Sequence, residues 1–135
     1  MDCTNGRYPP LLLIHPIGVG LSSRFWDRFI QRWRSDDPQA VLLAPDLVGC
    51  GDAACAIDPL TPHDWARPLH KLLRERNGEQ VILVTQGASL PIGLALLELA
   101  PELVSSLVAI SPPSWQVLKT KFPTERSQQL WNWLF

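Results

Sequence analysis

The part of this 135-residue sequence that most constrains its fold runs from Gln80 to Pro112. Positions 81–84 carry only β-branched residues and leucine, which is typical of a strand buried on both faces. A short turn leads into a largely apolar stretch at helical spacing, which ends at Pro101. Another apolar run, Val104 to Ile110, predicts a second strand. A strand, a helix and a strand in this order predict two parallel strands joined by a right-handed crossover.

The first half of the sequence shows the same alternation. Two further strands are predicted at Leu11–His15 and Ala40–Ala44. Each is an apolar run with turn-forming residues on both sides. We therefore expect one domain over residues 1–135, of the α/β class, with three layers (α/β/α) and a parallel sheet of about four strands.

Helices are predicted between these strands. The first runs from Ser22 or Ser23, which can cap it, through Trp33. Its apolar stripe, which we expect to be buried, consists of Phe25, Trp26, Phe29, Ile30 and Trp33. The second, from Thr61 to about Arg76, opens with the residues of a capping box. Pro68 should either kink this helix or delay its start, and a last helix is expected at 125–135.

The composition is that of a globular protein, with 46% hydrophobic and 19% charged residues and a net charge of −1. This balance gives no reason to expect a nucleic-acid or membrane partner, and no apolar run is long enough to span a bilayer. The first ten residues lack the apolar core of a secretion signal. Three cysteines give neither a disulfide framework nor a paired metal motif. We therefore expect a cytoplasmic location, without a metal or a cofactor.

Three short motifs follow one another along the chain. The first strand leads into His-Pro-Ile-Gly at His15 to Gly18, just before a helix that carries tryptophan. The second strand leads into Pro-Asp-Leu-Val-Gly-Cys-Gly at Pro45 to Gly51. The third strand leads into Thr-Gln-Gly-Ala-Ser at Thr85 to Ser89. In this order and on these elements, the motifs resemble the α/β-hydrolase superfamily from Leu11 to about Pro113.

The resemblance implies a partial α/β-hydrolase fold and hydrolysis of small-molecule esters. In this family the strand-to-helix turn carries a nucleophile in the pattern Gly-x-Ser-x-Gly. Here the nucleophile position is Gly87, which has no side chain and which we expect to adopt a positive φ. The resemblance places the two N–H donors of an oxyanion site at Ile17 and Ala88. His15 and Gln86 are candidate binding residues beside them, and we also interpret His15 as a structural residue at the end of a strand.

In a second frame, the motif is aligned with Gly87 to Pro91, and Ser89 is the alternative nucleophile. This frame moves the end of the following helix two residues away from its place in the family pattern. We therefore prefer the Gly87 frame. No histidine follows the turn in this sequence, and none of the later acidic residues stands just past a strand. Hydrolysis on this scaffold needs a nucleophile, a histidine base and an acid. We therefore expect the chain as it stands to be catalytically inactive.

The resemblance also implies a particular strand order. The strand at Leu11 should lie between those at Ala40 and Val81, with the strand at Val104 on the far side of Val81. This is the central part of the family's fold, and residues 114–135 would be the start of a lid. Apolar edges at 41–43 and 107–110 would then be open to self-association.

Two other functions fit the sequence. One is a non-catalytic α/β-hydrolase-fold protein that binds a small molecule or a partner in the same pocket. The other is a dinucleotide-binding βαβ unit, because Gly18-Val19-Gly20 follows a strand and Asp46 ends the next one. Against it, Ser23 stands where that motif has glycine or alanine.

Overall fold

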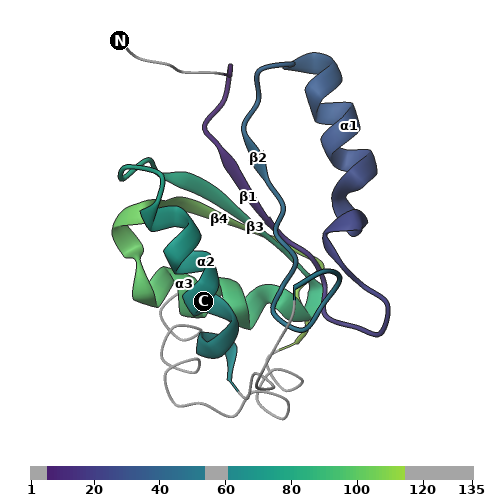
Figure 1. Ribbon diagram of the computed structural model, residues 1–135, viewed down its shortest axis with the longest axis vertical. Coiled ribbons are helices and arrows are strands. Elements are labelled where there is room, and N and C mark those ends of the chain that lie inside the picture. Colours follow the sequence, from purple (N-terminus) through teal and green to yellow (C-terminus); the bar gives the residue numbers. More distant parts are fainter. Residues whose placement is uncertain (1–5, 54–60, 115–135) are drawn as a thin grey trace.

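The computed structural model describes residues 6–53 and 61–114, and a sheet of four parallel strands forms its centre. The strands lie in the order β2-β1-β3-β4 (Figure 1). Their bounds are β1 (Leu11–Ile14), β2 (Leu42–Leu43), β3 (Val81–Gln86) and β4 (Val104–Ile110). The parallel pairing and the strand order confirm the prediction from the sequence. β2 is shorter than the predicted run, and β3 extends two residues further, into the turn.

Helices cover both faces of the sheet, which confirms the three layers. One face packs against α1 (Asp27–Asp36), which follows a 3-10 helix at Ser23–Trp26. The other face packs against α2 (Pro62–Arg74) and α3 (Leu90–Leu99), which lie on the opposite side of the sheet from α1 (Figure 1).

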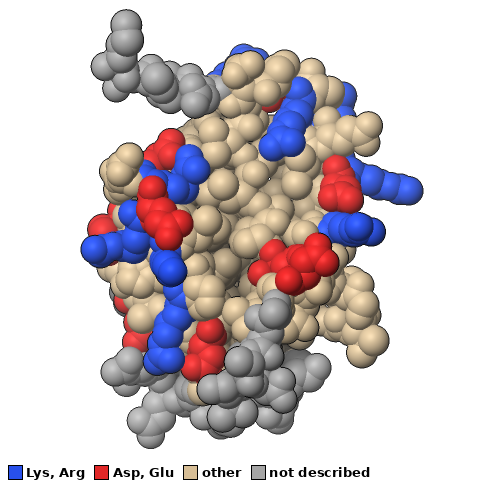
Figure 2. All heavy atoms as spheres, viewed as in Figure 1, with Lys and Arg blue, Asp and Glu red and all other residues tan. Residues whose placement is uncertain are grey.

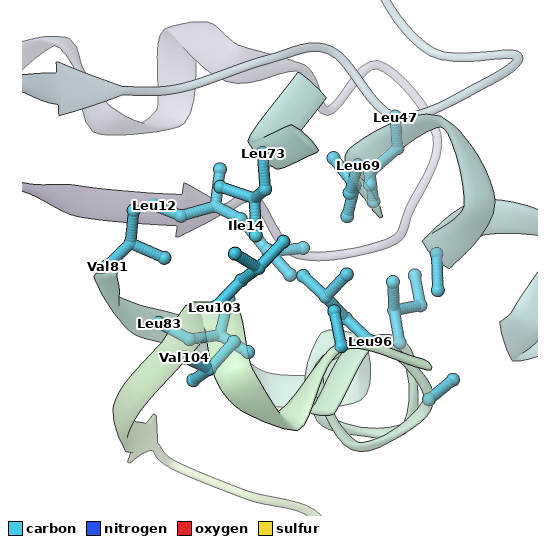
Figure 3. Close-up of a cluster of buried hydrophobic side chains, with 14 residues drawn as sticks. Leu12, Ile14, Leu47, Leu69, Leu73, Val81, Leu83, Leu96, Leu103 and Val104 are labelled. Carbon is cyan, nitrogen blue, oxygen red and sulfur yellow. The ribbon is translucent and has the colours of Figure 1, made fainter. Parts of the chain in front are cut away.

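Alternate side chains of each central strand point into two different cores. On β1, Leu11 and Leu13 belong to the core under α1, while Leu12 and Ile14 belong to the core under α2 and α3. Figure 3 shows this second, larger core, where side chains from the sheet and from the two helices meet. Each fully buried leucine there stabilises the fold by about 1.5–3 kcal/mol.

The apolar stripe of the first helix is buried only in part. Trp26 is buried, and Phe29, Ile30 and Trp33 pack against the core under α1. Phe25, which we expected to be buried, is 44% exposed. The reason is that the helix starts as a 3-10 helix, whose three residues per turn move Phe25 off the buried stripe. It still contacts Trp26 edge to face, at 5.0 Å between ring centres.

The second helix begins with the predicted capping box. The N–H of Asp64 donates to the Thr61 hydroxyl, and the N–H of Thr61 donates to the Asp64 carboxylate. Pro62 takes the first helical position, where its missing N–H does no harm. Pro68 does not delay the start of the helix, since α2 runs from Pro62 through it to Arg74. Pro68 is exposed, so water can replace the hydrogen bond that it removes.

The third helix approaches β3 very closely. A Cβ placed on Gly93 of α3 would lie 2.6 Å from the Cγ2 methyl of Thr85 on β3. Only glycine therefore allows this separation of the helix from the strand. α3 ends at Leu99, close to the predicted end at Pro101, and a 3-10 helix, Pro101–Leu103, connects it to β4.

The predicted last helix at 125–135 lies outside the described residues, and so does all of the lid start except Ser114. Within residues 6–53 and 61–114, none of the helices combines the length and apolar character that crossing a bilayer requires.

The close approach of α3 to β3 gives a test of the fold. Gly93→Ala should lower stability by about 1 kcal/mol, because a tight contact costs about 1–3 kcal/mol while alanine gains up to about 1 kcal/mol in a helix. Thr85→Ser removes the opposing methyl group. In that background Gly93→Ala should be neutral or stabilising in urea unfolding. An equal loss in both backgrounds would show that this contact does not set the helix position.

Candidate functional site

The turn between β3 and α3 is centred on Gly87, which has a φ of +55°. This confirms the positive φ expected from the sequence. Residues with a Cβ rarely adopt this conformation, and glycine adopts it at no steric cost. A Cβ built at Gly87 meets no atom within 4 Å. The position therefore faces open space, and it carries no functional group.

Reciprocal hydrogen bonds between Gln86 and Ser89 hold this turn. The N–H of Gln86 donates to Ser89 Oγ at 3.0 Å, and the side chain of Gln86 accepts from the N–H of Ser89. Ser89 is fully buried, and its hydroxyl lies 2.9 Å from the carbonyl oxygen of Gln86. A buried hydroxyl that caps a helix start is poorly placed to attack a substrate. The burial of Ser89 therefore favours the frame centred on Gly87.

The two candidate N–H donors lie on loops that follow adjacent strands. Ile17 follows β1 and Ala88 follows β3, and these strands pair directly, with Ile14 opposite Thr85. Both loops therefore leave the sheet at its carboxyl edge. Ala88 lies in the first turn of the helical segment, where the helix itself offers its N–H no acceptor. Ile17 is partly buried against the larger core, which anchors its loop.

His15 is a fully buried structural residue. Its Nε2 accepts the N–H of Leu47 at 3.0 Å, so that nitrogen carries no proton. Its Nδ1 lies 2.9 Å from the carbonyl oxygen of Pro16, to which it donates. The ring is therefore neutral, and both of its nitrogens bind backbone groups. It connects the loop after β1 to the loop after β2, and it has no nitrogen left to act as a base.

Asp46 joins the same two loops from the other side. Its carboxylate accepts the N–H of Ser23 at 2.7 Å and the N–H of Asp52 at 2.9 Å. These backbone donors, that of Ser23 first, lower the pKa of Asp46 below its ordinary value. A Cβ on Gly51 would overlap the carboxylate, so glycine is required there. The Pro-Asp-x-x-Gly-x-Gly motif thus wraps the loop around its own aspartate.

A hollow of about 510 Å³ lies between these two loops. It is lined by residues 18–24, by Asp46 and by residues 49–52, and it does not include the turn at Gly87. The face seen in Figure 2 carries basic and acidic side chains along both of its sides, and a group of acidic side chains lies near its middle.

One further pair connects the two helices on the larger core. His63 Nε2 of α2 lies 2.9 Å from the Glu98 carboxylate of α3, and both side chains are largely buried. Sequence reasoning missed this contact, because the two residues are 35 positions apart and neither belongs to a motif. It joins the two helices to each other.

Comparison with known proteins gives matches in structure alone. The sequence matches no family model, and no curated protein is significantly similar to it. A serine hydrolase from Cycloclasticus zankles is 20% identical over 96% of this chain and 54% of its own, with a TM-score of 0.66. A haloalkane dehalogenase from Agrobacterium tumefaciens is 24% identical over 78% of this chain and 34% of its own, with a TM-score of 0.63.

A third similar structure is an extracellular α/β-hydrolase from a Paenibacillus species, which is 14% identical over 78% of this chain and 42% of its own, with a TM-score of 0.63. This chain has a partial α/β-hydrolase fold. It spans 34% to 54% of the length of these three proteins. The similarity therefore covers the central sheet and its helices. It does not transfer the activities of those proteins to this chain.

The Asp46 contact within this α/β-hydrolase fold predicts a pH-dependent stability. Asp46→Asn keeps one acceptor oxygen and should lower the free energy of unfolding by about 1 kcal/mol at pH 7. The folded-state pKa of Asp46 is lowered, so the carboxylate stabilises the fold above its unfolded pKa of about 3.9. This stabilisation is lost as the pH falls through the folded-state value.

Urea unfolding of both proteins between pH 3 and pH 7 checks this expectation, and the difference between them should shrink below about pH 4. Asp36→Asn is the control, because Asp36 is exposed on α1 and its pair with Arg32 contributes little. A difference that stays constant over the whole pH range would contradict the role given to Asp46.

Proposed function

We propose that this chain is a non-hydrolysing α/β-hydrolase-fold protein that binds a small molecule at the turn between β3 and α3. One observation carries the proposal. The nucleophile position is occupied by Gly87, whose backbone has the positive φ of a strained elbow and whose Cβ position is open space. The turn therefore has the backbone conformation of a catalytic turn but carries no reacting group at its centre.

Hydrolysis of an ester on this scaffold needs a nucleophile, a base to take its proton and an acid to orient the base. Gly87 supplies no nucleophile, and Ser89 is buried with its hydroxyl bound to the turn. His15 precedes the turn, and backbone groups engage both of its nitrogens. The remaining histidines, His63 and His70, lie on α2, and His63 is paired with Glu98.

Binding requires less than hydrolysis does. The N–H groups of Ala88 and Ile17 belong to segments that leave the sheet at the same edge. A carbonyl oxygen that accepts hydrogen bonds from both would be held in the way that an oxyanion site holds its oxyanion. The missing side chain at Gly87 leaves room for the group next to that oxygen. The ligand class that fits best is therefore a small, neutral ester or amide with an accessible carbonyl.

The dinucleotide-binding alternative is not supported at the start of the first helix, where it would need free N–H donors. In such a unit the N–H groups at the helix start hold the pyrophosphate. Here the Asp46 carboxylate occupies the N–H of Ser23, and the hydroxyl of Ser22 accepts the N–H of Arg24. These two donors are taken, and the negative charge of Asp46 opposes a phosphate. Binding of a protein partner at the same turn remains the second candidate.

The proposal predicts no hydrolysis by the chain or by a variant with the missing serine. With 4-nitrophenyl acetate, both the natural chain and Gly87→Ser should turn over no faster than the heat-denatured protein, and a fluorophosphonate probe should label neither. Gly87→Ser lacks a base to activate its hydroxyl. It should also be about 1 kcal/mol less stable, because serine at positive φ is strained.

Gly78→Ser is the matched control for stability. Gly78 also has a positive φ, of +79°, and open space at its Cβ position, but it lies in the loop before β3. The two serine variants should therefore lose similar stability. Stoichiometric labelling of Ser89 in the natural chain would make Ser89 the nucleophile. Turnover by Gly87→Ser alone would reveal a base elsewhere in the chain and would overturn the proposal.

A further inference from the structure

A second hollow lies at the amino end of the sheet, opposite the edge that carries the turn at Gly87. It has a volume of about 170 Å³ and is lined by Tyr8, Trp33, Asp36 and Asp37. Tyr8 stands just before β1, and the other three residues belong to the last turn of α1 or follow it directly. Because α1 connects two parallel strands, its last turn returns to the end of the sheet at which β1 begins (Figure 1).

Two aromatic rings line this hollow. The rings of Tyr8 and Trp33 lie 5.7 Å apart between their centres, at 66° to each other. Trp33 packs in part against the core under α1, while Tyr8 is 50% exposed. The faces of such rings attract cations. The chain supplies its own example, because the guanidinium carbon of Arg7 lies 5.6 Å from the centre of the Tyr8 ring. Arg7 itself lines a neighbouring hollow and leaves this one open.

Two carboxylates line the same hollow. Asp37 is only 7% exposed, and its Oδ2 accepts the N–H of Arg7 at 2.7 Å, which fixes the side chain. Its other oxygen, Oδ1, accepts no hydrogen bond from the part of the chain that the structure describes. Asp36 pairs with Arg32 at 3.4 Å, but both side chains are exposed and such a pair is weak. A carboxylate as buried as Asp37 is stable when a positive group pairs with it, so this side chain points to a cationic ligand.

The end of α1 strengthens the negative potential of the hollow. Asp36 is the last residue of this ten-residue helix, and the final C=O groups of a helix carry a partial negative charge. Hard metal ions need more oxygen ligands than two carboxylates supply, and the described residues contain no group of three or more side chains suited to a metal. Aromatic rings beside carboxylates favour an organic cation instead.

We propose that this hollow binds a small molecule with an alkylated ammonium group. The rings of Tyr8 and Trp33 contact its methyl groups, and the carboxylates of Asp36 and Asp37 balance its charge. The site is separate from the turn at Gly87, and it does not depend on the ligand proposed there.

Choline and its neutral isostere 3,3-dimethyl-1-butanol test this site in the full chain. The two probes have the same shape, and only choline is charged. In an NMR titration at constant ionic strength, choline should shift the indole N–H signal of Trp33 to saturation. The dissociation constant should be roughly millimolar, because exposed cation–π contacts are weak, and the isostere should bind about fivefold less tightly. Equal binding of both probes, or no saturable shift with choline, would overturn the proposal.

Substitutions of Tyr8 separate the ring from its hydroxyl. Tyr8→Leu removes the ring at a half-exposed position and should weaken choline binding about fivefold. Tyr8→Phe is the matched control, because it keeps the ring, and its affinity should stay within about twofold of the natural chain. Similar affinities of the two variants would contradict a role for the ring.

Substitutions on α1 test the charge. Asp36→Asn should weaken choline binding about threefold, while Arg32→Gln should strengthen it, because Arg32 competes for the Asp36 carboxylate. A folding defect cannot produce effects of opposite sign. Asp27→Asn is the matched control, since it removes the same charge from the other end of α1, and it should leave binding unchanged. An equal loss in Asp27→Asn and Asp36→Asn would overturn the assignment of the charge to this hollow.

Discussion

The positive φ at Gly87 is the constraint on which the rest of the site depends. It reverses the chain between β3 and α3 within three residues and brings Ser89 back to cap the N–H of Gln86. The same reversal sets α3 against β3 so closely that a methyl group of Thr85 requires glycine at position 93. The strand, the turn and the helix thus form one unit, and the loop after β1 lies beside it because β1 pairs with β3.

Under the proposed function, this unit explains how the chain can keep the form of a catalytic turn without its reaction. A serine at this φ is strained, and that strain is maintained only where the surrounding structure holds it. Glycine removes the strain and leaves the capping bonds and the helix contact intact. The donors expected for a carbonyl oxygen are backbone groups, so the replacement of a nucleophile by Gly87 does not remove them. Binding without hydrolysis, as proposed above, is a function that such a turn can still perform.

Much of the fold could be predicted from the sequence because its signals are local. Each buried run, at 11–14 and 81–84, indicates a strand by itself. The capping box at Thr61 likewise indicates the start of α2, and Pro101 indicates the end of α3. Phe25 was predicted wrongly because periodicity does not reveal a 3-10 start. The contacts of His15 and Asp46 join loops more than 20 residues apart, and Ser89 showed its capping role only once its burial was known. Long-range hydrogen bonds leave no periodic trace in a sequence.

An NMR titration tests the central claim, binding at the turn without hydrolysis, most directly. The neutral amide 4-nitroacetanilide has the accessible carbonyl that the turn should accept. Our account predicts that the amide signals of Ala88 and Ile17 shift together and saturate, while that of Leu73, on the far end of α2, does not move. The ligand should be recovered unchanged. Shifts that avoid both Ala88 and Ile17, or the appearance of 4-nitroaniline, would contradict the account.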